Sequence, residues 1–155
     1  MTRRAMIRLI VLLVAALVIG YLGARQGAEE GAESGPDPPA IANSLGEEEI
    51  LEAFRTKSSG WWVQSSGVVD RNLADDNQGA RHQRFILRLS SGHSLLVSHN
   101  IDLAPRLQDL SPGNRVAFRG EYEWNVQGGI VHWTHHDPRG RKPGGWLEWK
   151  GERYR

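Results

Sequence analysis

The stretch HWTHHDPRGR, residues 132–141, holds three of the six histidines of the chain together with an aspartate. Imidazole nitrogens and carboxylates bind zinc and similar divalent ions, and they also serve as general acids and bases. A metal-dependent, nuclease-like hydrolase would need this stretch to meet a histidine from elsewhere in the fold. The candidate metal ligands on this interpretation are His82, His99, His135, His136 and Asp137.

The spacing within this stretch also has a structural explanation. If residues 130–136 form one strand, His132 and His136 lie about 13 Å apart, which is too far for a shared metal ion. A metal site therefore requires a bend, which Pro138 permits because it disfavours the helical conformation at the preceding Asp137. The favoured interpretation is structural: Asp137 caps backbone amides and the histidines pack against nearby tryptophans. Contact with a ligand is the third possibility.

A second set of candidates points outward from predicted strands. Arginines and glutamates alternate with apolar residues in HQRFILRLS and GNRVAFRGEYEWN, so they share the exposed faces of these strands. The chain also has six tryptophans, and exposed tryptophans beside arginines suit stacking on sugar rings or bases. The candidate ligand-binding residues are Arg84, Arg88, Arg119, Glu121 and Trp146. No catalytic residue is assigned, and cross-strand ion pairs explain the same charges without a ligand.

These candidates predict a non-enzymatic binding module for an extended polar ligand, either a nucleic acid or a glycan. On this interpretation the domain needs no cofactor, whereas the hydrolase alternative needs a divalent metal ion. A third hypothesis is an envelope protein that binds another protein, through an edge strand or through the ending GGWLEWKGERYR. A fold-level analogy alone does not choose among the three.

Residues 61–155 are predicted to form one all-β domain. Apolar and polar residues alternate in HQRFILRLS, GNRVAFRGEYEWN and IVHWTHH, and the segments WVQSSGVVDRNL and HSLLVSHN complete a set of five strands. The turns SSG and QGG join the second strand to the third and the fourth to the fifth. The connector NIDLAPRLQDLSPG between the two hairpins is broken by prolines. Three strands, a connector and two more strands predict a small, OB-fold-like, five-stranded Greek-key barrel.

Four strings of the chain resemble those of a known family. They are DDNQGARHQRFILRL, LLVSHNIDLAPRL, GEYEWNVQGGIVHWTHHDPRGR and GGWLEWKGERY. Together they resemble an uncharacterised bacterial family of domains of unknown function, DUF3465, which is found in short exported or membrane-anchored proteins. The resemblance covers roughly residues 67–154 and implies the fold and an exported location. It implies no activity, so the role of the histidine-rich stretch stays open.

The N-terminal residues predict where the domain lies in the cell. Arg3, Arg4 and Arg8 precede the apolar run LIVLLVAALVIGYLG, which predicts a signal anchor or transmembrane helix over residues 1–23. No small residues stand where a signal peptidase would cut, so an uncleaved anchor is favoured over secretion after cleavage. The arginines before the helix place the C-terminal domain outside the inner membrane, in the periplasm of a Gram-negative cell.

The segment that follows changes sharply in composition. Residues 24–46 are rich in Gly, Ala, Glu and Pro and predict a disordered acidic tether. GEEEILEAFRTK then predicts a short helix over residues 47–59, because an acidic first turn suits a helix N-terminus. The chain has no cysteine, which excludes disulfides, thiol catalysis and cysteine metal sites.

Overall fold

The computed structural model describes residues 40–155, which form one α-helix and seven β-strands. The elements are α2 (Ala40–Arg55), β1 (Trp61–Asn72), β2 (His82–Arg88), β3 (Ser94–Asn100), β4 (Arg115–Glu123), β5 (Ile130–His132), β6 (Trp146–Trp149) and β7 (Glu152–Tyr154). The predicted membrane helix, residues 1–23, and the predicted tether up to residue 39 lie outside the described residues. Within residues 40–155, no helix is long and apolar enough to cross a membrane.

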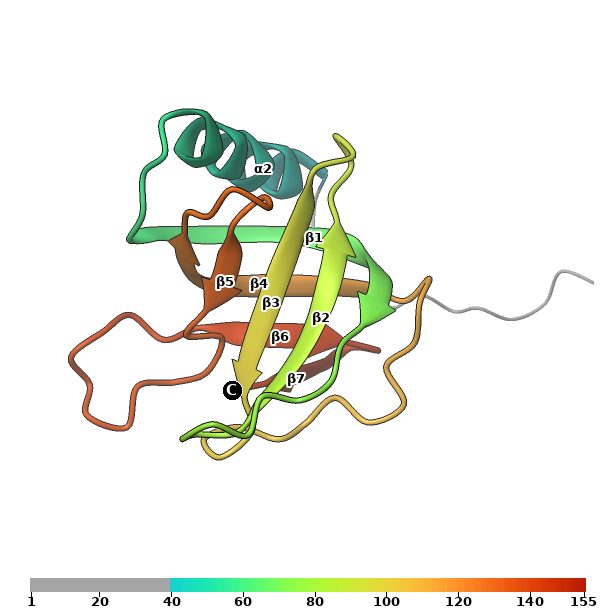
Figure 1. Cartoon of the computed structure of the whole chain (residues 1–155), viewed down its shortest axis with the longest axis vertical. Coiled ribbons are helices and arrows are strands. Elements are labelled where there is room, and N and C mark those ends of the chain that lie inside the picture. The colour runs from blue at the N-terminus through green and yellow to red at the C-terminus, as the bar shows by residue number, and fades with distance from the viewer. Residues whose placement is uncertain (1–39) are drawn as a thin grey trace, which may run out of the picture. The chain divides into compact units, whose positions relative to one another are not determined.

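Five of the strands close into a barrel (Figure 1). β1, β2 and β3 form an antiparallel meander, and β4 returns to pair with β1 from Trp61 to Val68. This spatial order, β4-β1-β2-β3, is that of a Greek key. β5 closes the barrel because it pairs antiparallel with β4 and parallel with β3. The all-β class and the five-stranded Greek-key barrel predicted from the sequence are confirmed.

Inward side chains fill the barrel with the period of two that its strands predict. Phe85 and Leu87 of β2 alternate with outward residues, and Phe118 and Tyr122 of β4 are equally buried. α2 lies across one end of the barrel (Figure 1). The connector between β3 and β4 contributes Leu107 to the core. Leu103 of the same connector does not enter the core and is 39% exposed.

The helix is longer at its start than the sequence predicted. It begins at Ala40 rather than at residue 47, so residues 40–46 belong to a helix and not to the tether. It ends at Arg55 rather than at residue 59, because Lys57 adopts a left-handed backbone conformation (φ 54) that a helix cannot continue. Gly46 packs directly on β1, where an added Cβ would lie 1.6 Å from the Gln64 carbonyl oxygen.

Glu47 ties this helix to the turn between β2 and β3. Its carboxylate accepts hydrogen bonds from the Ser90 amide at 3.2 Å, the Ser90 hydroxyl at 2.5 Å and the Ser91 amide at 2.5 Å. Burial raises the pKa of Glu47, but these hydrogen bonds outweigh it and hold the pKa below its ordinary value. The acidic residue that the sequence assigned to a helix N-terminus therefore fixes the helix to the barrel.

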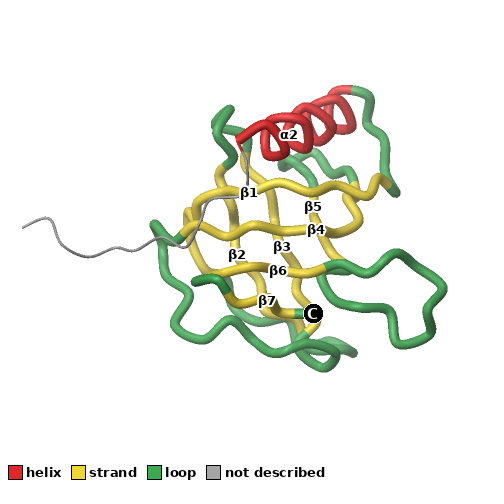
Figure 2. Tube along the Cα trace, turned by 180° about the vertical axis from the view of Figure 1, so that it is seen from behind, coloured by secondary structure: helices red, strands yellow, loops and turns green. Residues whose placement is uncertain are grey.

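β5 is shorter than predicted because the chain turns out of the sheet at Trp133. The sequence predicted a strand through residue 136, but Trp133 has φ 52, which ends the strand at His132. β6 then rejoins the same edge of β4: Glu121 pairs with His132 of β5, and Arg119 pairs with Trp146 of β6. Residues 133–145 thus form a loop that leaves the sheet between two strands on one edge (Figure 2).

Candidate functional site

β1, β4, β6 and β7 form a continuous sheet surface on one side of the barrel (Figure 2). Outward residues on this surface alternate with core residues: Trp62 precedes buried Val63, and Trp146 precedes buried Leu147. We call this surface the tryptophan face. Its members are Trp62, Arg119, Glu121, Trp133, Lys142, Trp146, Glu148 and Arg153.

Tryptophans and arginines alternate across the four strands of this face. The Arg119 guanidinium carbon lies 5.9 Å from the centre of the Trp62 ring, on the neighbouring strand. Arg119 pairs directly with Trp146 in the register of β4 and β6, and the Arg153 guanidinium carbon lies 4.2 Å from the Trp146 ring. Arg119 and Trp62, like Arg153 and Trp146, stand on diagonal positions of neighbouring strands, and long side chains on such positions reach each other. The contacts of Arg119 with Trp62 and of Arg153 with Trp146 are cation–π pairs.

The loop of residues 133–145 adds a third tryptophan and a lysine to the face. Lys142 Nζ lies 2.5 Å from Glu121 Oε2 and 4.6 Å from the centre of the Trp133 ring. The ammonium group therefore fixes the loop to the sheet through one carboxylate and one ring. Trp62, Trp133 and Trp146 are all half-buried, so each ring keeps an exposed part.

The charges of the face are balanced with one exception. Lys142 pairs with Glu121, and Arg153 pairs with Glu148 at 2.7 Å. Arg119 is half-buried, and within residues 40–155 its guanidinium has no ion pair and no hydrogen bond. A guanidinium carries five N–H donors in a rigid fork, so this one is available to a ligand.

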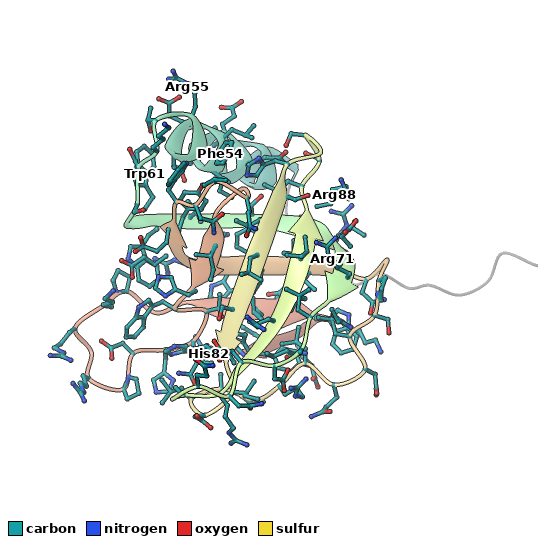
Figure 3. The ribbon with its side chains drawn as sticks, viewed as in Figure 1. Phe54, Arg55, Trp61, Arg71, His82 and Arg88 are labelled. Carbon is teal, nitrogen blue, oxygen red and sulfur yellow. The ribbon has the colours of Figure 1, made fainter. Side chains whose placement is uncertain are left out.

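The structure brings together three of the five predicted ligand-binding residues, Arg119, Glu121 and Trp146, and it places the other two elsewhere. Arg88 of β2 forms an ion pair with Asp70 at 2.5 Å. It lies near Arg71, whereas His82 lies at the opposite end of the same strand (Figure 3). Arg84, also on β2, donates from Nε to the Ala74 carbonyl at 3.0 Å.

Arg84 also lines a small cavity between the end of β1, β2 and the connector. The cavity has a volume of about 120 Å³, and two of the residues that line it, Arg106 and Asp75, form an ion pair. Ligand pockets usually enclose about 300–1,000 Å³. The cavity is therefore too small for an extended ligand, which leaves the tryptophan face as the candidate site.

His99, one of the candidate metal ligands, uses both ring nitrogens within the fold. Nε2 donates to the Pro105 carbonyl at 3.0 Å, so Nδ1 accepts a hydrogen bond from the Thr134 hydroxyl at 2.8 Å. The ring is fully buried, and burial lowers the pKa of His99 to about 4. The imidazole is thus neutral at physiological pH and joins the connector to the loop of residues 133–145.

The other candidate metal ligands do not assemble either. The Nδ1 atom of His82 forms a hydrogen bond with the Ala80 carbonyl at 2.8 Å. The Nδ1 atom of His135 forms one with the His136 carbonyl at 2.7 Å. The His135 ring also packs on Trp133, with 5.2 Å between the ring centres. Within residues 40–155, no group of three or more histidine or acidic side chains could hold a metal ion.

Asp137 caps backbone amides, as the structural interpretation predicted. It accepts hydrogen bonds from the amides of Arg139 at 2.9 Å, Arg141 at 2.8 Å and Lys142 at 2.9 Å. These hydrogen bonds, with that of Arg139 foremost, hold the pKa of Asp137 below its ordinary value. The carboxylate therefore shapes the part of the loop that delivers Lys142 to the face.

Replacing Asp137 with asparagine is expected to loosen this loop without unfolding the barrel. The amide keeps only one acceptor oxygen, so it cannot satisfy all three backbone donors. Trypsin should then cleave after Arg139 or Arg141 several times faster than in the unaltered protein, as followed by mass spectrometry. Asp109→Asn is the matched control, because no described hydrogen bond involves the Asp109 carboxylate. Equal cleavage rates in the two variants would contradict the capping role.

The family comparison agrees with the resemblance read from the sequence. The model of the family described as "Protein of unknown function (DUF3465)" matches residues 38–155. The chain belongs to this family. The match spans the helix α2, the barrel and the β6–β7 hairpin, so all elements of the tryptophan face lie within the family domain. No curated protein matches the chain.

The sequence indicated only part of the face. Outward positions of β4 follow from alternation, whereas the β6–β7 hairpin was not among the five predicted strands. Trp133 belongs to the predicted strand IVHWTHH, but its left-handed backbone conformation takes it out of that strand. The positions of Lys142 and Arg153 on the face could not be predicted from the sequence. Lys142 reaches Trp133 through the conformation of the loop, and Arg153 reaches Trp146 from a diagonal position on the neighbouring strand.

Proposed function

We propose that this domain is a non-enzymatic binding module and that an extended glycan binds on the tryptophan face. The observation that carries the proposal is the row of half-exposed rings, Trp62 and Trp146, on either side of Arg119, whose guanidinium forms no ion pair or hydrogen bond with the residues that the structure describes. Aromatic rings on a sheet surface provide stacking platforms for a chain-like ligand. Trp133 extends the platform at the edge where the loop returns.

The charge distribution favours a glycan over a single-stranded nucleic acid. A nucleic acid carries one phosphate per nucleotide and needs a groove with several free cations. On the tryptophan face, Glu121 and Glu148 lie among the rings and neutralise Lys142 and Arg153. Carboxylates repel phosphates but accept hydrogen bonds from sugar hydroxyls. The exposed Gln64, opposite Arg119 on β1, adds another donor and acceptor.

The proposed cellular location agrees with this ligand class. We infer from the N-terminal apolar run that the domain is anchored in the inner membrane and faces the periplasm, where wall and envelope glycans are accessible. The predicted tether would allow the domain to reach such glycans at some distance from the membrane. Fractionation of cells, with protease added to spheroplasts, tests this location.

Binding to purified cell-wall glycans and to single-stranded oligonucleotides, measured at low and high salt, tests the proposed function. We expect glycan binding that changes little with salt, since Arg119 is a single cation without an acidic partner among the described residues of the face. Trp62→Ala and Trp146→Ala should each weaken binding about tenfold or more, the scale of one lost aromatic stacking contact.

The control variant is Trp61→Ala. Trp61 is 39% exposed, but it is the neighbour of Trp62 along β1 and therefore points to the opposite side of the strand, near α2 (Figure 3). Its loss should leave glycan binding unchanged. Oligonucleotide binding that weakens steeply with salt, or equal losses in Trp61→Ala and Trp62→Ala, would overturn the proposal.

A further inference from the structure

Arg119 differs from the other cations of the tryptophan face because it has no acidic partner among residues 40–155. Lys142 has Glu121 at 2.5 Å and Arg153 has Glu148 at 2.7 Å. The guanidinium of Arg119 instead lies beside the Trp62 ring, at 5.9 Å from the ring centre. The centre of the face therefore carries one positive charge that no acidic residue within 40–155 neutralises.

The surroundings of Arg119 hold its guanidinium between two stacking platforms. Trp62 lies on the strand to one side and Trp146 lies directly opposite on the strand to the other side. Neighbouring strands lie about 4.8 Å apart, so the backbones that carry the two tryptophans are separated by about 10 Å. Because Trp62 pairs with Glu121 and Trp146 pairs with Arg119, a chain that stacks on both rings crosses β4 between Arg119 and Glu121, within reach of the Arg119 guanidinium that lies beside Trp62.

We propose that the glycan bound on this face carries carboxylates, and that Arg119 binds one of them while the adjoining sugar rings stack on Trp62 and Trp146. This inference rests on the proposed function. The planar fork of a guanidinium matches a carboxylate with two parallel hydrogen bonds, which a lysine cannot reproduce. Arg119 then selects acidic glycans, and the tryptophans supply affinity for any sugar chain.

The acidic residues of the face limit how much negative charge the ligand carries. Glu121 is two residues from Arg119 on the same side of β4, about 7 Å along the strand. Glu148 lies on the adjacent strand β6. A polymer with a phosphate at every unit would bring charges against these carboxylates, whereas one carboxylate beside Arg119 does not. The geometry therefore favours a carboxylated sugar over a phosphate-rich polymer.

Matched pairs of polysaccharides test the inference. The full chain, purified in detergent, is titrated with hyaluronan and with heparosan, in which carboxylated and uncharged sugars alternate, each with free carboxylates and as its methyl ester. We expect the acid form to bind about tenfold or more tightly than the ester, the scale of one charged hydrogen-bonded contact. Arg119→Gln should abolish this preference while keeping the weaker binding of the ester. Arg119→Lys should retain only part of the preference.

Arg71→Gln is the control for the change in net charge. Arg71 is an exposed cation at the far end of β1, where it pairs with Asp70 at 3.3 Å (Figure 3). It should keep the full preference for the acid form. Equal binding of acid and ester by the unaltered protein, or an equal effect of Arg71→Gln and Arg119→Gln, overturns the inference but leaves the glycan-binding function intact. Failure to bind any polysaccharide in either form overturns both.

Discussion

Replacing Gly145 with alanine is expected to lower the free energy of unfolding by about 1–3 kcal/mol, the usual cost of forcing an extra group into a packed site. An added Cβ would lie 1.8 Å from the Trp133 carbonyl oxygen and 2.7 Å from the Arg119 carbonyl oxygen. Neither atom can turn away, because both belong to the backbone. The Gly145 amide also donates to the His135 carbonyl at 2.8 Å, which fixes the loop against β6.

The neighbouring glycine provides the control for this prediction. At Gly144 the nearest atom to an added Cβ is the His136 Cα at 3.9 Å, an ordinary contact distance. Gly144→Ala should therefore change stability by less than about 0.5 kcal/mol in urea unfolding followed by tryptophan fluorescence. Because Gly145 lies next to Trp146 and against Trp133, its substitution should also reduce glycan binding. Similar unfolding midpoints for the two variants would refute the close backbone approach.

The second large effect is a loss of stability in mild acid that depends on His99. Burial lowers the pKa of His99 from an ordinary value of 6.5 to about 4, so the folded protein keeps the ring neutral while the unfolded chain protonates it. Between about pH 6.5 and pH 4 the unfolded state binds more protons, and stability falls as the pH falls. At pH 5 this single group should cost on the order of 2 kcal/mol relative to pH 7.5.

Unfolding by urea at a series of pH values measures this effect, with His99→Gln as the comparison. The glutamine amide can still donate to the Pro105 carbonyl but does not titrate, so its stability should fall less between pH 7.5 and pH 5. A direct readout is the NMR signal of the His99 ring in the unaltered protein. Protonation of that ring near pH 6.5 in the folded state would contradict the prediction, whatever the variant shows.

The barrel was predictable because its strands have one buried and one exposed face. In β2 and β3 the alternation of side chains fixes which residues point inward, and the turns between strands fix their order. The Greek-key closure follows from that order, since β2 already lies between β1 and β3, and β4 pairs with the other edge of β1. The helix was recognised, but its start was misplaced because residues 40–46 offer a single apolar pair at helical spacing, Ile41 and Leu45, directly after a segment rich in Gly and Pro.

The end of β5 was not predictable from local sequence. IVHWTHH alternates as a strand should, yet Trp133 takes a left-handed backbone conformation that is rare for a bulky residue. Contacts distant in sequence stabilise this conformation, including the hydrogen bond from Thr134 to His99 and that from Gly145 to His135. A single sequence contains no local trace of such contacts.

The candidate site was predictable to the extent that alternation defines it. Alternation identifies Arg84, Arg88 and Arg119 as outward residues, but it does not say which side of a closed barrel each one faces. The structure separates the two residues of β2 from Arg119 on β4. Lys142 reaches the face because Asp137 folds the loop back, which depends on hydrogen bonds to three backbone amides.

The return of β6 to the same edge of β4 separates the register of the sheet from the length of the loop of residues 133–145. β4 alone sets the register on both sides, with Glu121 opposite His132 and Arg119 opposite Trp146. Thr134 and Gly145 tie the base of the loop to the barrel, whereas residues 138–144 are exposed and can be inserted or deleted without shifting either strand. The ligand preference that we propose for the tryptophan face can then change by exchange of this exposed segment while the sheet stays constant, much as hypervariable loops vary on a conserved framework.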